Sequence, residues 1–96
     1  MIIRLGDNVV VIQESDGEAC VVTRPCIMGG VATHIIHSPY DAHEIAAWLS
    51  KRLKRGAPLA QHAFPDMKPE DREFLISGIT PEYWNKMFPR EEKAHD

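Results

Sequence analysis

The sequence predicts an α+β fold, in which an N-terminal antiparallel sheet of three to four strands is packed by one long helix and followed by a C-terminal helical hairpin. Three observations lead to this prediction. Two β-branched runs flank a tight-turn dipeptide early in the chain, a periodic helical segment with start and stop signals occupies the middle, and two short helical patterns joined by a turn lie near the C-terminus.

Composition indicates one folded domain. The chain has 96 residues, 44% of them hydrophobic, and a formal net charge of −3, which is typical of a globular protein. We expect a single domain over residues 1–89, made of the sheet and helix (1–56) and a connector with a helical corner (57–89), and a disordered tail (90–96). No apolar run approaches the ~20 residues that cross a bilayer, and no signal peptide is recognisable. We therefore expect a cytoplasmic protein without a membrane partner.

The strand signals lie before residue 38. IIRL predicts a short first strand, and VVVIQESDGEACVVTRP predicts a hairpin around Asp16-Gly17, a pair that suits the positive φ angles of a tight turn. Because Val9–Ile12 is continuously apolar, we expect this strand to be central in the sheet or covered on both faces. VATHIIH predicts a further strand, whose alternate residues face opposite sides. One side carries Val31, Thr33, Ile35 and His37, and the other carries Ala32, His34 and Ile36.

The long helix is predicted over SPYDAHEIAAWLSKRLKRG. Ser38 is the expected N-cap, with Pro39 at N1 and Asp41 three residues on as a short capping box. Gly56 supplies the stop signal. One apolar stripe faces the sheet; it consists of Ala42, Ile45, Leu49 and Leu53, with Trp48 on its margin.

Lys51, Arg52, Lys54 and Arg55 form a basic cluster at the end of this helix. Cations in a last turn complement the helix dipole and keep the surface hydrated. The same cluster is also a candidate partner-binding patch. Both interpretations stay open at this point.

The segment after the helix has two parts. Residues 56–69 form a connector with three prolines, which Leu59 and Phe64 are expected to hold against the core, with a single helical turn in LAQHAF. Pro69 then begins a helix at N1, and Gly78 ends it in the left-handed conformation. This ending predicts the hydrophobic pair of a Schellman motif, formed by Phe74 and Ile79.

A second helix follows the glycine. Thr80 is the expected N-cap, Pro81 lies at N1, and Ile79 with Trp84 forms a hydrophobic staple. The apolar residues of this helix occupy one stripe; they are Tyr83, Trp84, Met87 and Phe88.

The first of these two helices has more apolar surface than one sheet face can cover. Phe74, Leu75 and Ile76 are consecutive and span about 200° around the helix axis. Either the second helix folds back over the open side, which we expect, or another chain covers it, since large exposed apolar patches are uncommon on monomers.

No catalytic motif is present. The sequence contains no GxSxG elbow, phosphate loop, HExxH or dinucleotide fingerprint, so we expect neither an enzyme nor a cofactor. The spacings of the potential zinc ligands fit no closed zinc finger, and we expect no metal site. These ligands are Cys20, Cys26, His34, His37 and His43. A Cys–His nucleophile pair, such as Cys26 with His34 or His37, would need a geometry that spacing does not reveal.

Charge is unevenly distributed. Residues 1–56 carry six basic and six acidic side chains, whereas residues 57–96 carry five basic and eight acidic ones. Proteins that bind nucleic acids usually show a basic excess, so a nucleic-acid partner is disfavoured.

Two resemblances bear on function. FPDMKPEDREFLISGITPEYWNKMF (64–88) resembles the C-terminal segment of small uncharacterised bacteriophage proteins, which share an acidic pair before REFL and then a glycine before TPE-x-W. Residues 9–53 are similar, in order of elements, to the hairpin, third strand and helix of small phage anti-CRISPR proteins. Together they imply a phage protein that works in the host cytoplasm by occupying a partner's surface.

The leading hypothesis is a non-enzymatic protein that engages a host protein or complex, including a defence system such as CRISPR. The alternatives are a small nucleic-acid-binding regulator and a homo-oligomeric phage accessory or structural protein, for which a second copy is the partner. The candidate partner-binding residues are Leu75, Tyr83, Trp84, Met87, Lys51, Arg52, Lys54 and Arg55.

Overall fold

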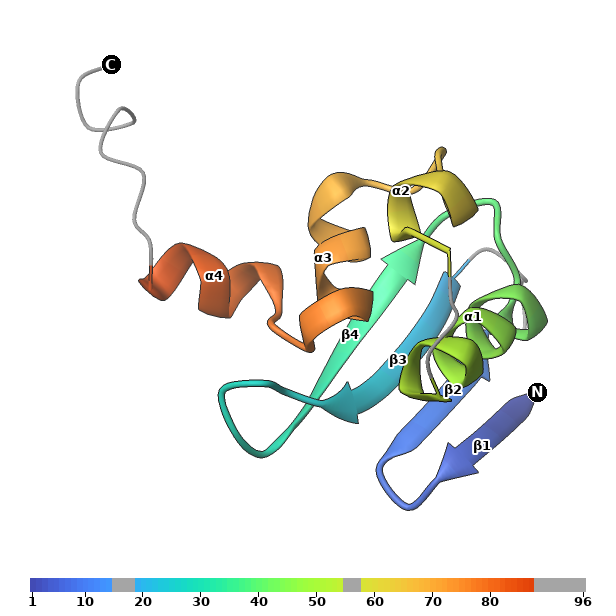
Figure 1. Ribbon diagram of the computed structural model, residues 1–96, viewed down its shortest axis with the longest axis horizontal. Helices are drawn as coiled ribbons and strands as arrows, with labels where there is room; N and C mark the ends of the chain where they lie inside the picture. Colours follow the sequence, from blue (N-terminus) through green and yellow to red (C-terminus); the bar gives the residue numbers. More distant parts are fainter. Residues whose placement is uncertain (15–18, 55–57, 88–96) are drawn as a thin grey trace.

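A computed structural model describes residues 1–14, 19–54 and 58–87 (only the backbone at residues 53 and 54), and in these ranges four strands precede four helices (Figure 1). The strands are β1 (Ile2–Gly6), β2 (Val9–Gln13), β3 (Ala19–Pro25) and β4 (Val31–His37). The helices are α1 (Ala42–Lys54), α2 (Ala60–Ala63), α3 (Pro69–Ser77) and α4 (Pro81–Met87). Each strand pairs antiparallel with its neighbour in sequence, in the order β1-β2-β3-β4. The predicted α+β class is confirmed.

The sheet has one covered face and one open face. As expected for its apolar run, β2 is a central strand, with Val9 and Val11 buried on the helix side and Val10 and Ile12 half-buried on the other. The alternation predicted for β4 is also confirmed, because Ile36 is buried whereas the residues on either side of it are exposed. The turn predicted at residues 16–17 lies outside the described residues.

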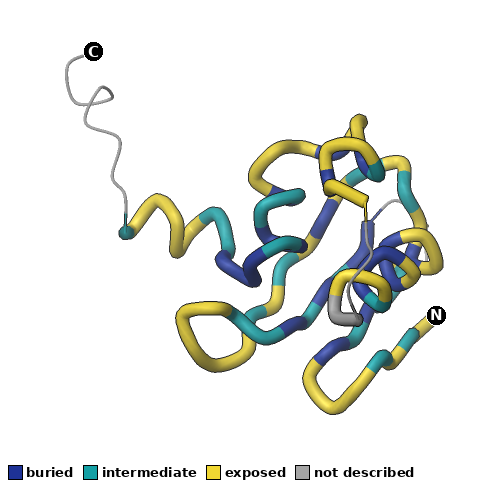
Figure 2. The backbone as a smooth tube through the Cα atoms, in the orientation of Figure 1, coloured by how far each residue is buried: buried dark blue, intermediate teal, exposed yellow. Residues whose placement is uncertain are grey.

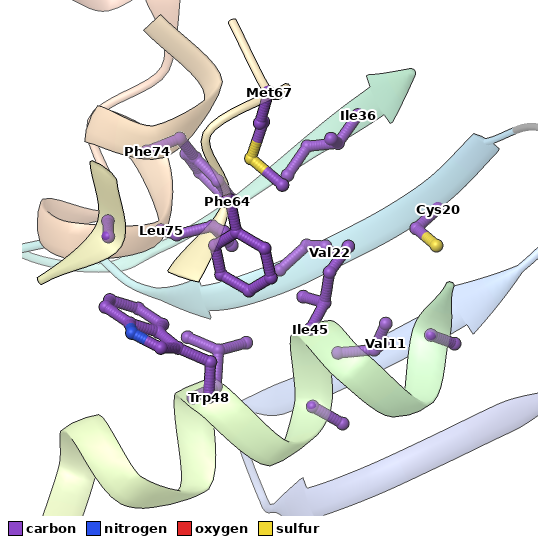
Figure 3. Packing of buried hydrophobic residues seen from close by; sticks show 14 of the residues in the cluster. Val11, Cys20, Val22, Ile36, Ile45, Trp48, Phe64, Met67, Phe74 and Leu75 are labelled. Atoms are coloured by element: carbon purple, nitrogen blue, oxygen red, sulfur yellow. The ribbon is translucent and has the colours of Figure 1, made fainter. Parts of the chain in front are cut away.

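The core fills the space between the covered face and three helices. α1 packs against β1 and β2, while α3 lies over β4 and β3, and α2 sits beside α3 (Figures 1 and 3). The largest fully buried side chains come from both the sheet and the helices; they are Val11, Val22, Ile36, Ile45, Leu49, Phe74 and Leu75. None of the described helices is both long and apolar enough to cross a membrane.

The start of α1 differs from the prediction. The Asp41 Oδ1 atom accepts a hydrogen bond from the Glu44 amide (2.9 Å), and the Glu44 Oε1 atom accepts one from the Asp41 amide (3.0 Å). This reciprocal pair is a complete capping box, so Asp41 rather than Ser38 is the N-cap. Ser38 instead accepts a hydrogen bond from the Tyr40 amide in the preceding turn. The glutamate three residues after Asp41 reaches back to the Asp41 amide, which makes Asp41 the better cap.

Replacing Asp41 by alanine is expected to lower the free energy of unfolding by about 1 kcal/mol, the usual cost of losing an N-cap side chain. Replacing Ser38 by alanine is the matched control and is expected to change it by less than about 0.5 kcal/mol, as surface substitutions usually do. Urea unfolding followed by circular dichroism measures both changes. Equal losses in the two variants would contradict the assignment of Asp41 as the cap.

The connector is held to the core by different residues than expected. Phe64 is buried as predicted and packs edge-on against the rings of Tyr40 and Trp48. Leu59, by contrast, is 62% exposed, so the prediction that it anchors the connector is wrong. The Trp48 Nε1–H group replaces it by donating a hydrogen bond to the Pro58 carbonyl (2.8 Å). The predicted helical turn is confirmed as α2.

Candidate functional site

The corner between α3 and α4 is built by Gly78 and Thr80. Gly78 has φ +80° and its amide donates to the Phe74 carbonyl (2.7 Å), as predicted for a left-handed ending. The Ile79 amide donates to the Ser77 hydroxyl (3.1 Å) instead of the Phe74 carbonyl. The ending is therefore the simpler αL motif and not the predicted Schellman motif. Thr80 is confirmed as the cap of α4, because its hydroxyl accepts a hydrogen bond from the Tyr83 amide (3.1 Å).

A buried joint fixes the end of α3 to the β3–β4 hairpin. Arg24 is buried, and its Nη1 atom donates to the carbonyls of Leu75 (2.6 Å) and Ile76 (3.2 Å). The Ile27 amide donates to the Ser77 carbonyl (2.9 Å). Burial, followed by the nearby charge of Arg52, lowers the pKa of the Arg24 guanidinium, which remains charged in proteins at any ordinary pH. Its charge faces the negative end of the α3 dipole, where a cation is stabilised.

Gly78 closes the same joint by its lack of a side chain. A Cβ atom at this position would lie 2.3 Å from the Pro25 carbonyl oxygen and 2.7 Å from the Cys26 Cα atom. Only glycine lets the hairpin backbone approach the helix this closely. The joint, defined as Arg24 together with residues 25–27 and 75–78, therefore determines where α4 begins.

The open side of α3 is covered by the connector and not by α4. Phe74 and Leu75 are fully buried, and the half-buried Ile76 lies beside Ala60 of α2. The Arg72 Nη1 atom donates to the Phe64 carbonyl (3.3 Å), which holds the two segments together. α4 contacts α3 at the corner but has no buried residue, and it points away from the core (Figures 1 and 2). The expectation that α4 folds back over α3 is wrong.

A groove of about 250 Å³ lies between α3 and α4. Its apolar lining consists of two prolines, one isoleucine and one tryptophan, and its polar lining consists of two carboxylates and one amide. The lining residues are Pro69, Glu70, Glu73, Ile79, Pro81, Trp84 and Asn85. Within the described part of the chain, neither Glu70 nor Glu73 forms an ion pair. The groove therefore combines exposed apolar surface with a negative rim.

The predicted binding residues fall into three places. Tyr83 and Trp84 are 38% and 40% exposed on α4, and Met87 is half-buried there. Leu75 is fully buried under the corner, so it belongs to the core and not to a surface. Lys51 and Arg52 are exposed on α1, on a different part of the molecule from α4 (Figure 1). Residue 55 and the side chain of residue 54 lie outside the described parts.

Sequence reasoning missed two features near this site. Glu70 and Glu73 lie near the start of a predicted helix, where acidic residues are favoured by the helix dipole and need no further explanation. Only the fold shows that they line a groove together with Trp84. Arg24 was not singled out at all. An arginine between apolar strand residues was the available signal, because such a residue must find buried acceptors or point to solvent.

The potential metal ligands do not gather at one place. His34 Nε2 lies 2.7 Å from Asp71 Oδ1 and joins β4 to α3 beside the Phe74 ring. Burial, followed by the charge of Asp41, raises the pKa of the Cys20 thiol and keeps it neutral. Among residues 1–14, 19–54 and 58–87, no group of three or more His, Cys, Asp and Glu side chains is placed to hold a metal ion.

The second cysteine has a local role. The Cys26 Sγ atom accepts a hydrogen bond from the Met28 amide (3.4 Å) inside the β3–β4 turn, and Cys26 is half-buried. Its partner is therefore a backbone group of its own hairpin.

Comparison of the chain with protein-family models, with curated proteins and with solved structures found no match.

Proposed function

We propose that this chain is a small, non-enzymatic binding protein of the bacteriophage type, which engages a host protein through the groove between α3 and α4. The composition of the groove carries the proposal, since an apolar lining with an exposed tryptophan accompanies two carboxylates that lack ion-pair partners in the described chain. None of the described residues that line the groove is a serine, cysteine, histidine or lysine. It offers apolar surface and carboxylates for binding a side chain.

The groove favours a partner segment that combines a positive charge with an apolar residue. Glu70 and Glu73 are three residues apart on α3, so their carboxylates project from the same side of the helix. A lysine or arginine of the partner can lie near both carboxylates, with its aliphatic stem against the apolar part of the groove lining. A neighbouring apolar side chain fits against Ile79 and Pro81.

The resemblances described above support the phage class and a host target. The acidic excess over residues 57–96 favours a cationic target. Proteins of bacterial defence systems such as CRISPR bind nucleic acids through basic grooves, and a basic segment of such a protein has the chemistry that this groove accepts. An inhibitor of this kind acts by occupying the partner's surface.

Capture of proteins from bacterial lysate by the immobilised chain tests this proposal. Two groove variants are compared with the wild type: the double substitution Glu70→Lys/Glu73→Lys and the single substitution Trp84→Ala. The control Asp7→Lys/Glu14→Lys makes the same change in charge at exposed positions in the N-terminal hairpin. Circular dichroism confirms that each variant is folded.

The expected result is a stoichiometric protein partner that the wild type and the control retain. We expect both groove variants to lose it about tenfold or more, which corresponds to at least ~1.4 kcal/mol of binding free energy. Failure to capture any stoichiometric protein would count against the proposal, as would a partner that the groove variants retain. Salt-sensitive binding of nucleic acid that is lost on replacing Lys51 and Arg52 would favour the regulator instead.

A further inference from the structure

The open face of the sheet is unusually apolar. Antiparallel sheets commonly turn a polar face to solvent when only one side is packed, and α1, α2 and α3 lie on one side of this sheet (Figure 1). The strand register places twelve side chains on the open face, of which eight are apolar and one, that of Arg4, is charged. They are Ile2, Arg4, Val10, Ile12, Ala19, Val21, Thr23, Pro25, Val31, Thr33, Ile35 and His37.

An aliphatic row crosses all four strands of this face. Ile2 pairs with Ile12, Ile12 with Val21, and Val21 with Ile35, so four β-branched side chains stand side by side. The ends of the row are well exposed, at 65% for Ile2 and 49% for Ile35. Rows of this kind normally form the inner layer of two sheets packed face to face.

The two threonines on this face are arranged so that they can be buried. Thr23 and Thr33 lie opposite each other, and their hydroxyl oxygens are hydrogen-bonded at 2.8 Å. Because each hydroxyl already has a partner, covering the face does not leave these groups unsatisfied. Arg4 lies on β1, the edge strand, where its long side chain can reach solvent beyond a covering layer.

We propose that this open face is the interface with a second copy of the chain. The face carries one positive strand residue, Arg4, and one acidic residue at its margin, Glu82 of α4, which lines a hollow with Val21, Thr33 and Ile35. These opposite charges neither repel a copy of the same face nor make a one-sign pattern that would select a foreign partner. A twofold axis can bring the aliphatic row against its own copy, as isologous interfaces require. The two sheets would then pack about 10 Å apart with the helices outside.

The size of the face indicates the strength of such a dimer. Four strands of five to seven residues, spaced about 4.8 Å apart and rising about 3.3 Å per residue, form a face of roughly 20 by 20 Å. That is below the roughly 800 Å² per partner of a standard interface, even after allowing for the relief of the side chains. We therefore expect a weak, reversible dimer with a dissociation constant in the micromolar range.

Light scattering and analytical ultracentrifugation of the purified chain between about 5 and 500 μM, the range in which a micromolar dimer forms, test the inference. The wild type is expected to rise with concentration from 10.9 kDa toward twice that mass. Ile12→Lys and Ile35→Lys are both expected to stay at the monomer mass. Leu59→Lys, at an exposed apolar position of the connector, is the matched control and is expected to dimerise like the wild type.

Each outcome distinguishes between the possible arrangements. A wild type that is monomeric throughout the concentration range overturns the inference. Loss of the dimer in Ile35→Lys alone also overturns it, since Ile12 lies on the central strand β2 and only Ile35 lies on the edge strand β4, so such a result indicates pairing of edges. Circular dichroism identifies any variant that is unfolded, and Ile12→Thr, which keeps the β-branched shape but adds a hydroxyl, then replaces it and is expected to weaken the dimer. Because the α3–α4 groove uses other residues, the proposed function can fail or hold independently of this result.

Discussion

Replacing Gly78 by alanine is expected to lower the free energy of unfolding by about 3–5 kcal/mol, the upper range for a single substitution. Two costs combine. The left-handed backbone at φ +80° disfavours a side chain by about 1 kcal/mol. The larger cost is steric, because the new Cβ atom would lie 2.3 Å from the Pro25 carbonyl oxygen and 2.7 Å from the Cys26 Cα atom, and backbone atoms cannot move aside as a flexible side chain can.

Gly29→Ala is the matched control for this experiment. Gly29 also has a positive φ, +108°, but no atom lies within 4 Å of a Cβ atom placed there. We expect a loss of about 1–2 kcal/mol from backbone strain alone. Urea unfolding of both variants separates the steric cost from the backbone cost. Similar losses for the two glycines would show that the hairpin and α3 do not approach as closely as described.

Replacing Arg24 by methionine is expected to cost about 2–4 kcal/mol of unfolding free energy. Methionine has a similar length but no donors, so the carbonyls of Leu75 and Ile76 lose their shared partner at the end of α3. A buried acceptor left without a hydrogen bond costs about 1–3 kcal/mol, and loss of the favourable charge at the helix terminus adds to it.

Arg4→Met controls for the general effect of removing an arginine. Arg4 is exposed on β1, and its replacement is expected to change the stability by less than about 0.5 kcal/mol. Arg24→Lys is expected to fall between the wild type and Arg24→Met, because an ammonium group keeps the charge but lacks the planar fork that reaches several carbonyls. Thermal unfolding measures all three variants. An Arg24→Met protein as stable as the Arg4→Met protein would contradict the role of the joint.

The elements that the sequence predicted well are those with local signals. The turn and periodicity rules identify all four strands and the long helix because each depends on neighbouring residues. The end of α3 at Gly78 and the cap at Thr80 are predicted for the same reason, since the φ angle of a glycine and the reach of a threonine hydroxyl are local properties. Even the cap of α1 was missed by only three residues.

The errors concern contacts between segments that are distant in sequence. Leu59 and Phe64 have the same apolar character in the connector, yet only Phe64 reaches the core. The apolar residues of α3 extend beyond the surface that the sheet can cover, so another segment has to pack over them. The sequence does not show whether α4 or the connector is that segment. The Arg24–Leu75 hydrogen bond joins residues that are 51 positions apart, and no periodicity contains that information.

The candidate site was partly predictable for a related reason. Tyr83 and Trp84 lie on a short amphipathic helix, and the structure leaves both exposed, although the sequence equally allowed them to be core residues. Leu75 shares their apolar character but lies on α3, where it is fully buried in the same core cluster as Phe74 and the connector residue Phe64. Of the aliphatic row, the sequence assigned a strand face only to Ile35, because the assignment of the other three and their pairing across the sheet require the register.

The position of α3 in the core has a consequence for how the protein is made. Phe64, Met67, Phe74 and Leu75 belong to the same buried cluster as Val22 and Ile36 of the strands (Figure 3). During synthesis the ribosome releases the strands and α1 first, and nothing then shields this half of the sheet from water. The apolar interior is completed only when residues 60–75 emerge, so the finished fold depends on residues that are translated after the strands and α1.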